Sequence, residues 1–287
     1  GSVVKAMASA KDAYPHVVAL FRHDLAALDP TEQPRRDAQR RALFLKLDEE
    51  LLAVVEDVVR LTPTIIEVIV RAPAAARNFE PGQFYRLQNY EASSTVIEGT
   101  RLAMEGIALT GAWVDKEKGL LSLIALEMGV STRLLSSLKK GEPIVLMGPT
   151  GSPTEIPSSE TVLLAGGGLG NAVLFSIAKA LRAEGARVIY FAGYKNGADL
   201  FKQDEIEVST DQVIWCSDIG VEITPRRPQD RHFRGNIVQA MKAYAEGAFG
   251  GEMFKLSEVK RIIAIGSDRI MNAVREARHG VLAPYLD

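Results

Sequence analysis

The strongest constraint on the fold is a hydrophobic strand that runs directly into a glycine-rich turn and then a helix. It spans Val162–Ala172 and contains the run Gly166-Gly167-Gly168-Leu169-Gly170-Asn171. Glycines permit positive φ angles and close approach of a ligand, and a helix N-terminus offers unpaired N–H groups with partial positive charge. We therefore predict that this turn cradles a pyrophosphate. A turn that only packs the helix on the strand remains the alternative, because Asn171 breaks the G-x-G-x-x-G spacing.

The segments around and after this turn alternate between strand and helix patterns. Short hydrophobic runs predict strands over 161–165, 187–192, 212–216 and 261–265, and helical patterns fall at 171–184, 236–245 and 270–277. This alternation predicts a parallel sheet with right-handed crossovers, which binds ligands beyond the carboxyl ends of its strands. The residues at or just beyond these ends form the predicted nucleotide-binding set: Gly166, Gly167, Gly168, Leu169, Gly170, Asn171, Gly193, Tyr194, Lys195, Ser217, Asp218, Gly266, Asp268 and Met271.

The second predicted strand leaves the choice between NAD and NADP open. No acidic residue directly ends it to bind a ribose diol, and Lys195 either meets a 2′-phosphate or is solvated. The single cysteine, Cys216, also lies at a strand end. It either packs in the core, as buried cysteines usually do, or contacts the nicotinamide.

The region before the turn has a different pattern. Short strands are predicted over 54–59, 64–70, 84–87, 106–110, 120–126 and 144–147, separated by glycine and proline turn signals, which is typical of a small antiparallel barrel. Residues 3 to about 57 are mostly helical in pattern, with a break at Asp29-Pro30 and a second helix over Glu32–Leu51. We predict three parts: a helical extension or linker (1–50), a barrel (51–150) and an α/β domain (151–287).

Composition excludes several classes of protein. The net charge of −2 gives no global field for nucleic acid, and the apolar runs are too short to cross a bilayer. One cysteine excludes an internal disulfide and a cysteine-ligated cluster built from this chain alone, and the four histidines show no ligand spacing, so no metal site is predicted. No secretory signal is present, and we expect a cytoplasmic location. Gly1-Ser2 without a starting Met resembles a tag scar.

From about Leu51 to Asp287, the order of these motifs resembles the ferredoxin–NADP reductase superfamily. The motifs are Phe79–Phe84 with its Pro-Gly-Gln-Phe run, Gly129–Leu135 with Leu138–Gly141 and Gly148–Gly151, the Gly166–Gly170 turn, and Gly266–Met271. The chain is most similar to the iron–sulfur-linked branch. That branch includes the dihydroorotate dehydrogenase electron-transfer subunit, sulfide dehydrogenase and the small subunit of NADH-dependent reduced ferredoxin:NADP oxidoreductase.

The resemblance implies FAD on the barrel, NAD(P) on the sheet and an iron–sulfur domain or subunit as partner. The branch carries its cluster on cysteines near the C-terminus, which this chain lacks, so we expect it to be a piece of a longer polypeptide. The implied FAD-binding residues are Ile107, Ala108, Leu109, Thr110, Gly129, Val130, Ser131 and Thr132. Thr110 is implied to lie near the reactive flavin nitrogen and is the candidate catalytic residue.

The phosphate-binding cation of the implied flavin site is missing at its usual position. The branch often has Arg where Gly106 stands, and Arg101 is a candidate substitute from a nearby loop. An ordinary barrel strand over Leu109 and Thr110 is the alternative.

These expectations lead to two functional hypotheses. The first is an oxidoreductase module that transfers hydride between NAD(P)H and FAD and passes electrons to an iron–sulfur centre outside this chain. The second is a non-catalytic nucleotide-sensing or docking module of a larger redox enzyme that has lost FAD. An ordinary Rossmann dehydrogenase fits poorly, because a barrel precedes the glycine turn. The arginine-rich segment Gly220–Phe233 is expected to be a solvated excursion rather than a partner site.

Overall fold

The computed structural model describes residues 3–286, so the predicted tag scar at Gly1-Ser2 lies outside the described residues. The chain divides into two compact units, residues 1–49 and 50–287. The N-terminal helices are α1 (Val3–Leu20), α2 (Arg22–Ala26) and α3 (Gln33–Leu51). The first helix ends at Leu20, earlier than the predicted break. At that break, the Asp29 carboxylate accepts a hydrogen bond from the Thr31 amide at 2.8 Å and caps a short 3-10 turn.

The second unit begins with the predicted barrel, which is closed and antiparallel in the order β1-β2-β7-β6-β3-β8. Its strands are β1 (Ala53–Arg60), β2 (Ile65–Arg71), β3 (Phe84–Asn89), β6 (Ile107–Asp115), β7 (Leu120–Leu126) and β8 (Pro143–Thr150). Between them lie α4 (Pro73–Arg77), the hairpin β4 (Val96–Ile97) and β5 (Thr100–Arg101), and α5 (Val130–Leu134). The side chains alternate as a half-buried sheet requires: Tyr85 and Leu87 fill the barrel core, whereas Arg86 between them is exposed.

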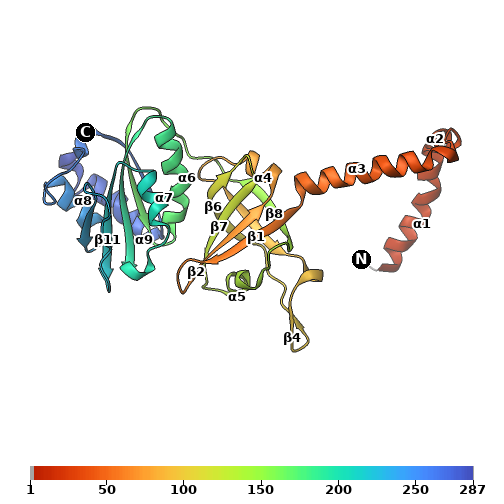
Figure 1. Ribbon diagram of the computed structural model, residues 1–287, viewed down its shortest axis with the longest axis horizontal. Coiled ribbons are helices and arrows are strands. Elements are labelled where there is room, and N and C mark those ends of the chain that lie inside the picture. Colours follow the sequence, from red (N-terminus) through yellow and green to blue (C-terminus); the bar gives the residue numbers. More distant parts are fainter. Residues whose placement is uncertain (1–2, 287) are drawn as a thin grey trace. The chain divides into compact units, whose positions relative to one another are not determined.

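The predicted α/β region is a five-stranded parallel sheet in the order β12-β11-β10-β9-β13, so the fold class is confirmed (Figure 1). Its strands are β9 (Thr161–Gly167), β10 (Arg187–Asn196), β11 (Gln212–Ile219), β12 (Arg231–Arg234) and β13 (Val259–Ile265). Its helices are α6 (Gly170–Ala183), α7 (Gln203–Val208), α8 (Ile237–Ala245) and α9 (Asp268–His279). One buried cluster joins the sheet to α6, and another joins the sheet to α8 and α9. No helix within residues 3–286 has both the length and the hydropathy that a bilayer crossing requires.

The arginine-rich segment is exposed in part, but two of its arginines and its last residues are bound to the rest of the domain. Arg226 forms an ion pair with Glu207 at 2.8 Å, and Arg227 forms one with the buried Asp230 at 2.8 Å. The end of the segment is strand β12, which pairs in parallel with β11. Glu207 precedes Arg226 by 19 positions, so the charge run alone gave no indication of that pairing, whereas Asp230 lies in the same segment as Arg227.

Helix α6 packs against the barrel as well as against the sheet. Ile65, Ala112 and Ile124 of the barrel belong to the same buried cluster as Phe175 of α6. A buried ion pair adds a second connection, because Lys202, which precedes α7, lies 2.9 Å from the carboxylate of Glu67 on β2. The barrel and the sheet within residues 50–287 therefore share the buried cluster around α6, in addition to the barrel's own core.

Candidate functional site

The carboxyl ends of four neighbouring parallel strands meet at one edge of the sheet. Strands β13, β9, β10 and β11 are adjacent and parallel, so their last residues and the segments that follow lie along the same edge. These segments are the glycine turn, Gly193–Lys195, Ser217–Asp218 and Gly266–Asp268, which contain nearly all of the predicted nucleotide-binding residues. The structure thus brings together residues from positions 166 to 268 of the chain.

Close packing explains most of the glycines at this edge. A Cβ on Gly170 would lie 2.4 Å from the Ile265 carbonyl oxygen, and a Cβ on Gly167 would lie 2.2 Å from the Ile270 side chain. Gly168 differs, because its φ is +55° and no heavy atom lies within 4 Å of the position of a Cβ. Gly168 therefore forms the open part of the turn, where a ligand can approach the backbone.

Asn171, which breaks the expected glycine spacing, fixes the turn through hydrogen bonds of its side chain. The side chain is fully buried, and its amide nitrogen donates to the carbonyl oxygens of Gly168 at 2.9 Å and Gly193 at 3.3 Å. Its amide oxygen accepts from the Tyr190 hydroxyl at 2.9 Å. Asn171 departs from the glycine motif, yet its hydrogen bonds fix the ends of β9 and β10 relative to each other.

Several predicted contact residues have buried side chains. The Tyr194 ring lies in the core cluster with Phe201, and the Ser217 hydroxyl lies 2.9 Å from the His232 Nε2 atom. Cys216 is 1% exposed within the cluster formed with α8, and burial raises the pKa of its thiol, which favours the packing interpretation. By contrast, Gly168, Lys195, Asp218, Asp268 and Met271 are exposed at the edge, and Leu169, Gly170 and Gly266 are half-buried.

In the strand that the resemblance places against the flavin, the side chains of Ile107 and Leu109 point toward the barrel core. The Leu109 side chain is 6% exposed and belongs to the barrel core, and Ile107 packs partly against that core. Ala108 and Thr110 alternate with them and are exposed and half-buried, respectively. On the neighbouring strand they pair with Arg86 and Phe84. Any ligand on the outer face of the barrel therefore meets Thr110 and Ala108 rather than the Leu109 side chain.

The Gly129–Thr132 turn lies beside the start of this strand. The Thr132 hydroxyl accepts from the Met128 and Gly129 amides at 3.1 and 3.0 Å, which fixes the turn. The Ser131 hydroxyl accepts from the Glu105 amide at 3.2 Å, two residues before Ile107. The Val130 side chain remains 78% exposed. The turn and the Ile107–Thr110 strand are therefore connected, as the resemblance implies.

Arg101 is held at its own loop rather than at the vacant position. Its guanidinium donates to the backbone carbonyl oxygens of Glu91 at 2.7 Å and Ala92 at 3.3 Å, so it holds its own loop. A different arginine lies at the vacant position: the Arg86 Nη2 atom donates to the Gly106 carbonyl oxygen at 3.0 Å. Sequence analysis missed Arg86. The signal that could have found it is the cross-strand pairing of the Pro-Gly-Gln-Phe strand with the strand that contains Ala108.

These two regions suit the chemistry of the two implied cofactors. The open backbone at Gly168, at the start of α6, fits a pyrophosphate at the sheet edge. On the barrel, an exposed guanidinium next to a hydroxyl-bearing turn supplies the donor set that a second phosphate group requires. The residues present therefore fit NAD(P) on the sheet and FAD on the barrel.

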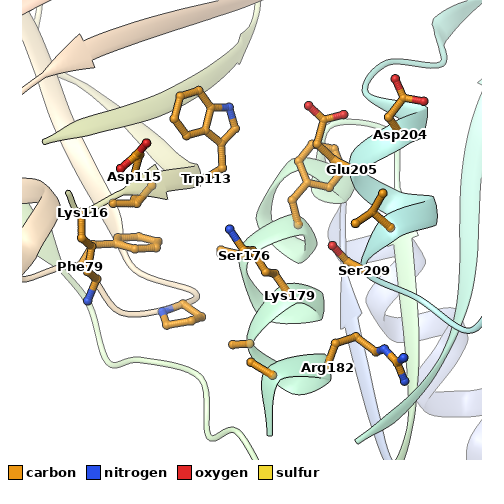
Figure 2. A pocket seen from close by; sticks show the side chains of 16 residues that line it. Phe79, Trp113, Asp115, Lys116, Ser176, Lys179, Arg182, Asp204, Glu205 and Ser209 are labelled. Carbon is orange, nitrogen blue, oxygen red and sulfur yellow. The ribbon is translucent and has the colours of Figure 1, made fainter. Parts of the chain in front are cut away.

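A groove is also present away from these residues. Its volume is about 940 Å³, and it is bordered by barrel strand β6 at Trp113, by α6 and by α7 at Glu205 (Figure 2). Figure 2 shows Ser176 and Lys179 of α6 along its floor. None of the predicted site residues lines this groove. Across residues 3–286, no three His, Cys, Asp or Glu side chains gather in a way that would hold a metal ion.

Comparisons with known proteins agree with this architecture. No protein-family model matches the chain. An uncharacterised protein of Rickettsia prowazekii is 36% identical over 194 residues, which cover 68% of this chain and 25% of that protein. The dihydroorotate dehydrogenase B (NAD(+)) electron transfer subunit homolog of Thermotoga maritima is 30% identical over 161 residues, which cover 56% of this chain and 53% of that subunit.

A solved structure matches over a longer stretch. The NADH-dependent reduced ferredoxin-NADP oxidoreductase, studied for flavin-based electron bifurcation, has a TM-score of 0.62 and 25% identity, covering 79% of this chain and 72% of that chain. The matched segment thus spans about half of the Thermotoga subunit and a quarter of the Rickettsia protein. The chain has a ferredoxin reductase-like fold and is a distant homologue of the dihydroorotate dehydrogenase electron-transfer subunits and of the NADH-dependent reduced ferredoxin-NADP oxidoreductase.

Proposed function

We propose that this chain is an electron-transfer module in which hydride passes between NAD(P)H and FAD. The observation that carries the proposal is the combination, in one compact unit, of an open glycine turn at a sheet edge with a barrel face that carries the exposed guanidinium of Arg86. The printed names of its relatives, an electron transfer subunit homolog and a ferredoxin-NADP oxidoreductase, support it. FAD, when bound, supplies the ring that exchanges hydride with the nicotinamide.

The chain's own residues bind and orient, and no general acid or base is required. Gly168 and the first turn of α6 hold the nucleotide pyrophosphate through backbone N–H groups. Lys195 and Asp218 border the same edge, where the ribose of the nucleotide is expected. Thr110 offers a half-buried hydroxyl on the outer face of the barrel, where the resemblance implies that the reactive flavin nitrogen would lie. The core shared by α6 and the barrel holds the two surfaces in a fixed arrangement, which favours transfer by orientation.

We further propose the division into a helical extension (1–50), a FAD-binding barrel (51–150) and an NAD(P)-binding domain (151–287). Because the single cysteine of this chain cannot ligate an iron–sulfur cluster by itself, its electron acceptor is proposed to lie outside it. An iron–sulfur domain or subunit is the acceptor that the resemblance implies. Single electrons would leave through that partner.

The test is to titrate the purified chain with FAD and then, without oxygen, with NADH or NADPH. We expect FAD to bind and its visible absorbance to bleach with at least one nucleotide, which also identifies the preferred nucleotide. A chain that binds NAD(P)H but takes up no FAD would overturn the proposal. That outcome would favour the nucleotide-sensing or docking module.

A further inference from the structure

Arg86 occupies a position that no sequence motif indicates. It lies on the outer face of β3, between the buried Tyr85 and Leu87, and its side chain is exposed. Its Nη2 atom donates to the Gly106 carbonyl oxygen at 3.0 Å, across to the segment that leads into β6. The guanidinium is therefore held at the start of the strand that carries Ala108 and Thr110.

The absence of a side chain at Gly106 leaves the space that Arg86 uses. A Cβ at this position would lie 3.4 Å from Arg86 Nη2, 3.5 Å from Nε and 3.6 Å from Gln88 Oε1. A Cβ alone would just fit, but a longer side chain would compete with the guanidinium for the same space. Gly106 has an ordinary backbone conformation, without a positive φ, so backbone strain does not explain the glycine. Room for Arg86 is the physical reason that the structure offers.

Arg86 retains donors for an anion. A guanidinium has five N–H groups, and here one nitrogen bonds to a neutral carbonyl oxygen. No carboxylate among residues 3–286 forms an ion pair with Arg86. Arg226 and Arg227 contrast with it, because their guanidinium groups form ion pairs with Glu207 and Asp230. Arg101 also has exposed donors, but its Nη1 atom is bound to the backbone of its own loop, at Glu91 and Ala92.

The surroundings of Arg86 match a ligand that is anionic at one end and apolar at the other. Glu105, adjacent to Gly106, donates its amide to the Ser131 hydroxyl, which connects the guanidinium to the Gly129–Thr132 turn. The Met128 and Val130 side chains are each 78% exposed on that turn. On the other side of Arg86, the cross-strand neighbour Met147 is 46% exposed. The Arg86 guanidinium is thus bordered by solvent-exposed apolar side chains.

We propose that Arg86 is the cation that binds the pyrophosphate of FAD on the barrel, reaching across the space left by Gly106. This inference rests on the proposed function and names the residue that anchors its flavin. Arginine suits the role because its planar fork forms paired hydrogen bonds to phosphate oxygens. A charge-assisted hydrogen bond of this kind corresponds to roughly a 10- to 150-fold change in affinity.

The test measures dissociation constants by the change in flavin fluorescence, without any turnover. FAD and riboflavin, which lacks phosphate, are each titrated into wild type, Arg86→Met and Arg101→Met. We expect Arg86→Met to weaken FAD binding roughly 10- to 150-fold, to leave riboflavin binding unchanged, and to flatten the salt dependence of FAD binding. Arg101→Met is the matched control and should bind both flavins like wild type.

A relocation variant separates a lost charge from a damaged fold. In Arg86→Met/Gly106→Arg the guanidinium enters the same space from the other strand, and we expect it to recover most of the lost FAD affinity. If wild type and Arg86→Met both bind FAD equally well, the inference is overturned and the proposed function still stands. Equal losses of FAD and riboflavin affinity, with no recovery in the relocation variant, would also overturn it. If wild type binds no FAD, the proposed function itself fails.

Discussion

The buried ion pair between Lys202 and Glu67 should be the most sensitive contact between the barrel and the sheet. The two side chains are 20% and 1% exposed, and Glu67 also accepts hydrogen bonds from Trp113 Nε1 at 2.9 Å and from Ser122 Oγ at 2.6 Å. Burial lowers the pKa of Lys202, but Glu67 and Glu205 more than offset this, and the net direction is upward. Lys202 is therefore charged at neutral pH.

Lys202→Met removes the cation and leaves a buried carboxylate with only neutral donors. Breaking one side of a buried pair costs about 3–5 kcal/mol, and the partial exposure of Lys202 favours the lower end. At roughly 2–4 °C per kcal/mol for a domain of this size, we expect the unfolding temperature to fall by about 6–12 °C. Lys202 has a φ of +54°, and Met at this position bears similar backbone strain, so the substitution isolates the charge.

Thermal and denaturant unfolding of a double-mutant cycle provides the assay. Glu67→Gln keeps an acceptor for Trp113 and Ser122 and should cost less, about 1 kcal/mol, because Lys202 can reach solvent. The double variant should be more stable than Lys202→Met alone. Glu205→Gln removes the more exposed partner of Lys202 and should change stability by about 1 kcal/mol or less. A Lys202→Met protein that unfolds at the wild-type temperature would refute the reasoning.

Three further predictions concern the sheet edge. Gly170→Ala should destabilise the unit far more than Gly168→Ala in thermal unfolding, since its Cβ would lie 2.4 Å from a backbone carbonyl oxygen, whereas only the positive φ opposes a Cβ on Gly168. Equal losses would contradict this account. Asn171→Ala should cost about 1–3 kcal/mol by denaturant unfolding, since it removes three hydrogen bonds of a fully buried side chain, those to the Gly168 and Gly193 carbonyl oxygens and that from the Tyr190 hydroxyl; Tyr190→Phe, which removes one of these bonds, should cost less. Burial lowers the pKa of His232 below 6.5, so stability should decline as the pH falls through that value, and His232→Gln should flatten the decline between about pH 7 and 5. If His232→Gln shows the wild-type pH dependence of stability, the assignment of the decline to His232 is wrong.

The elements that sequence analysis predicted well are those whose hydrophobic pattern is local. The strand before Gly166 and the helix after it form one continuous signal, and the structure has both. Strand β12 was missed because its four residues, Arg-His-Phe-Arg, contain no hydrophobic run and pair only with β11 at the sheet edge. Its position depends on the neighbouring strand rather than on its own composition.

The site was less predictable than the fold for the same reason. Gly106 and Arg86 are separated by 20 positions, and only the register between β3 and β6 brings them together. The inward direction of Leu109 likewise follows from that register, which motif spacing does not specify. Asn171 was treated as a defect in a motif, although its buried hydrogen bonds hold the turn.

The most direct test of the central claim is anaerobic mixing of the FAD-loaded chain with NADH or NADPH, in normal form and deuterated at the transferred position. If hydride passes between the two cofactors on this chain, the visible flavin absorbance bleaches, and it bleaches more slowly with the deuterated nucleotide. If FAD binds but its spectrum does not change with either nucleotide, the claim that this chain is a hydride-transfer module is contradicted.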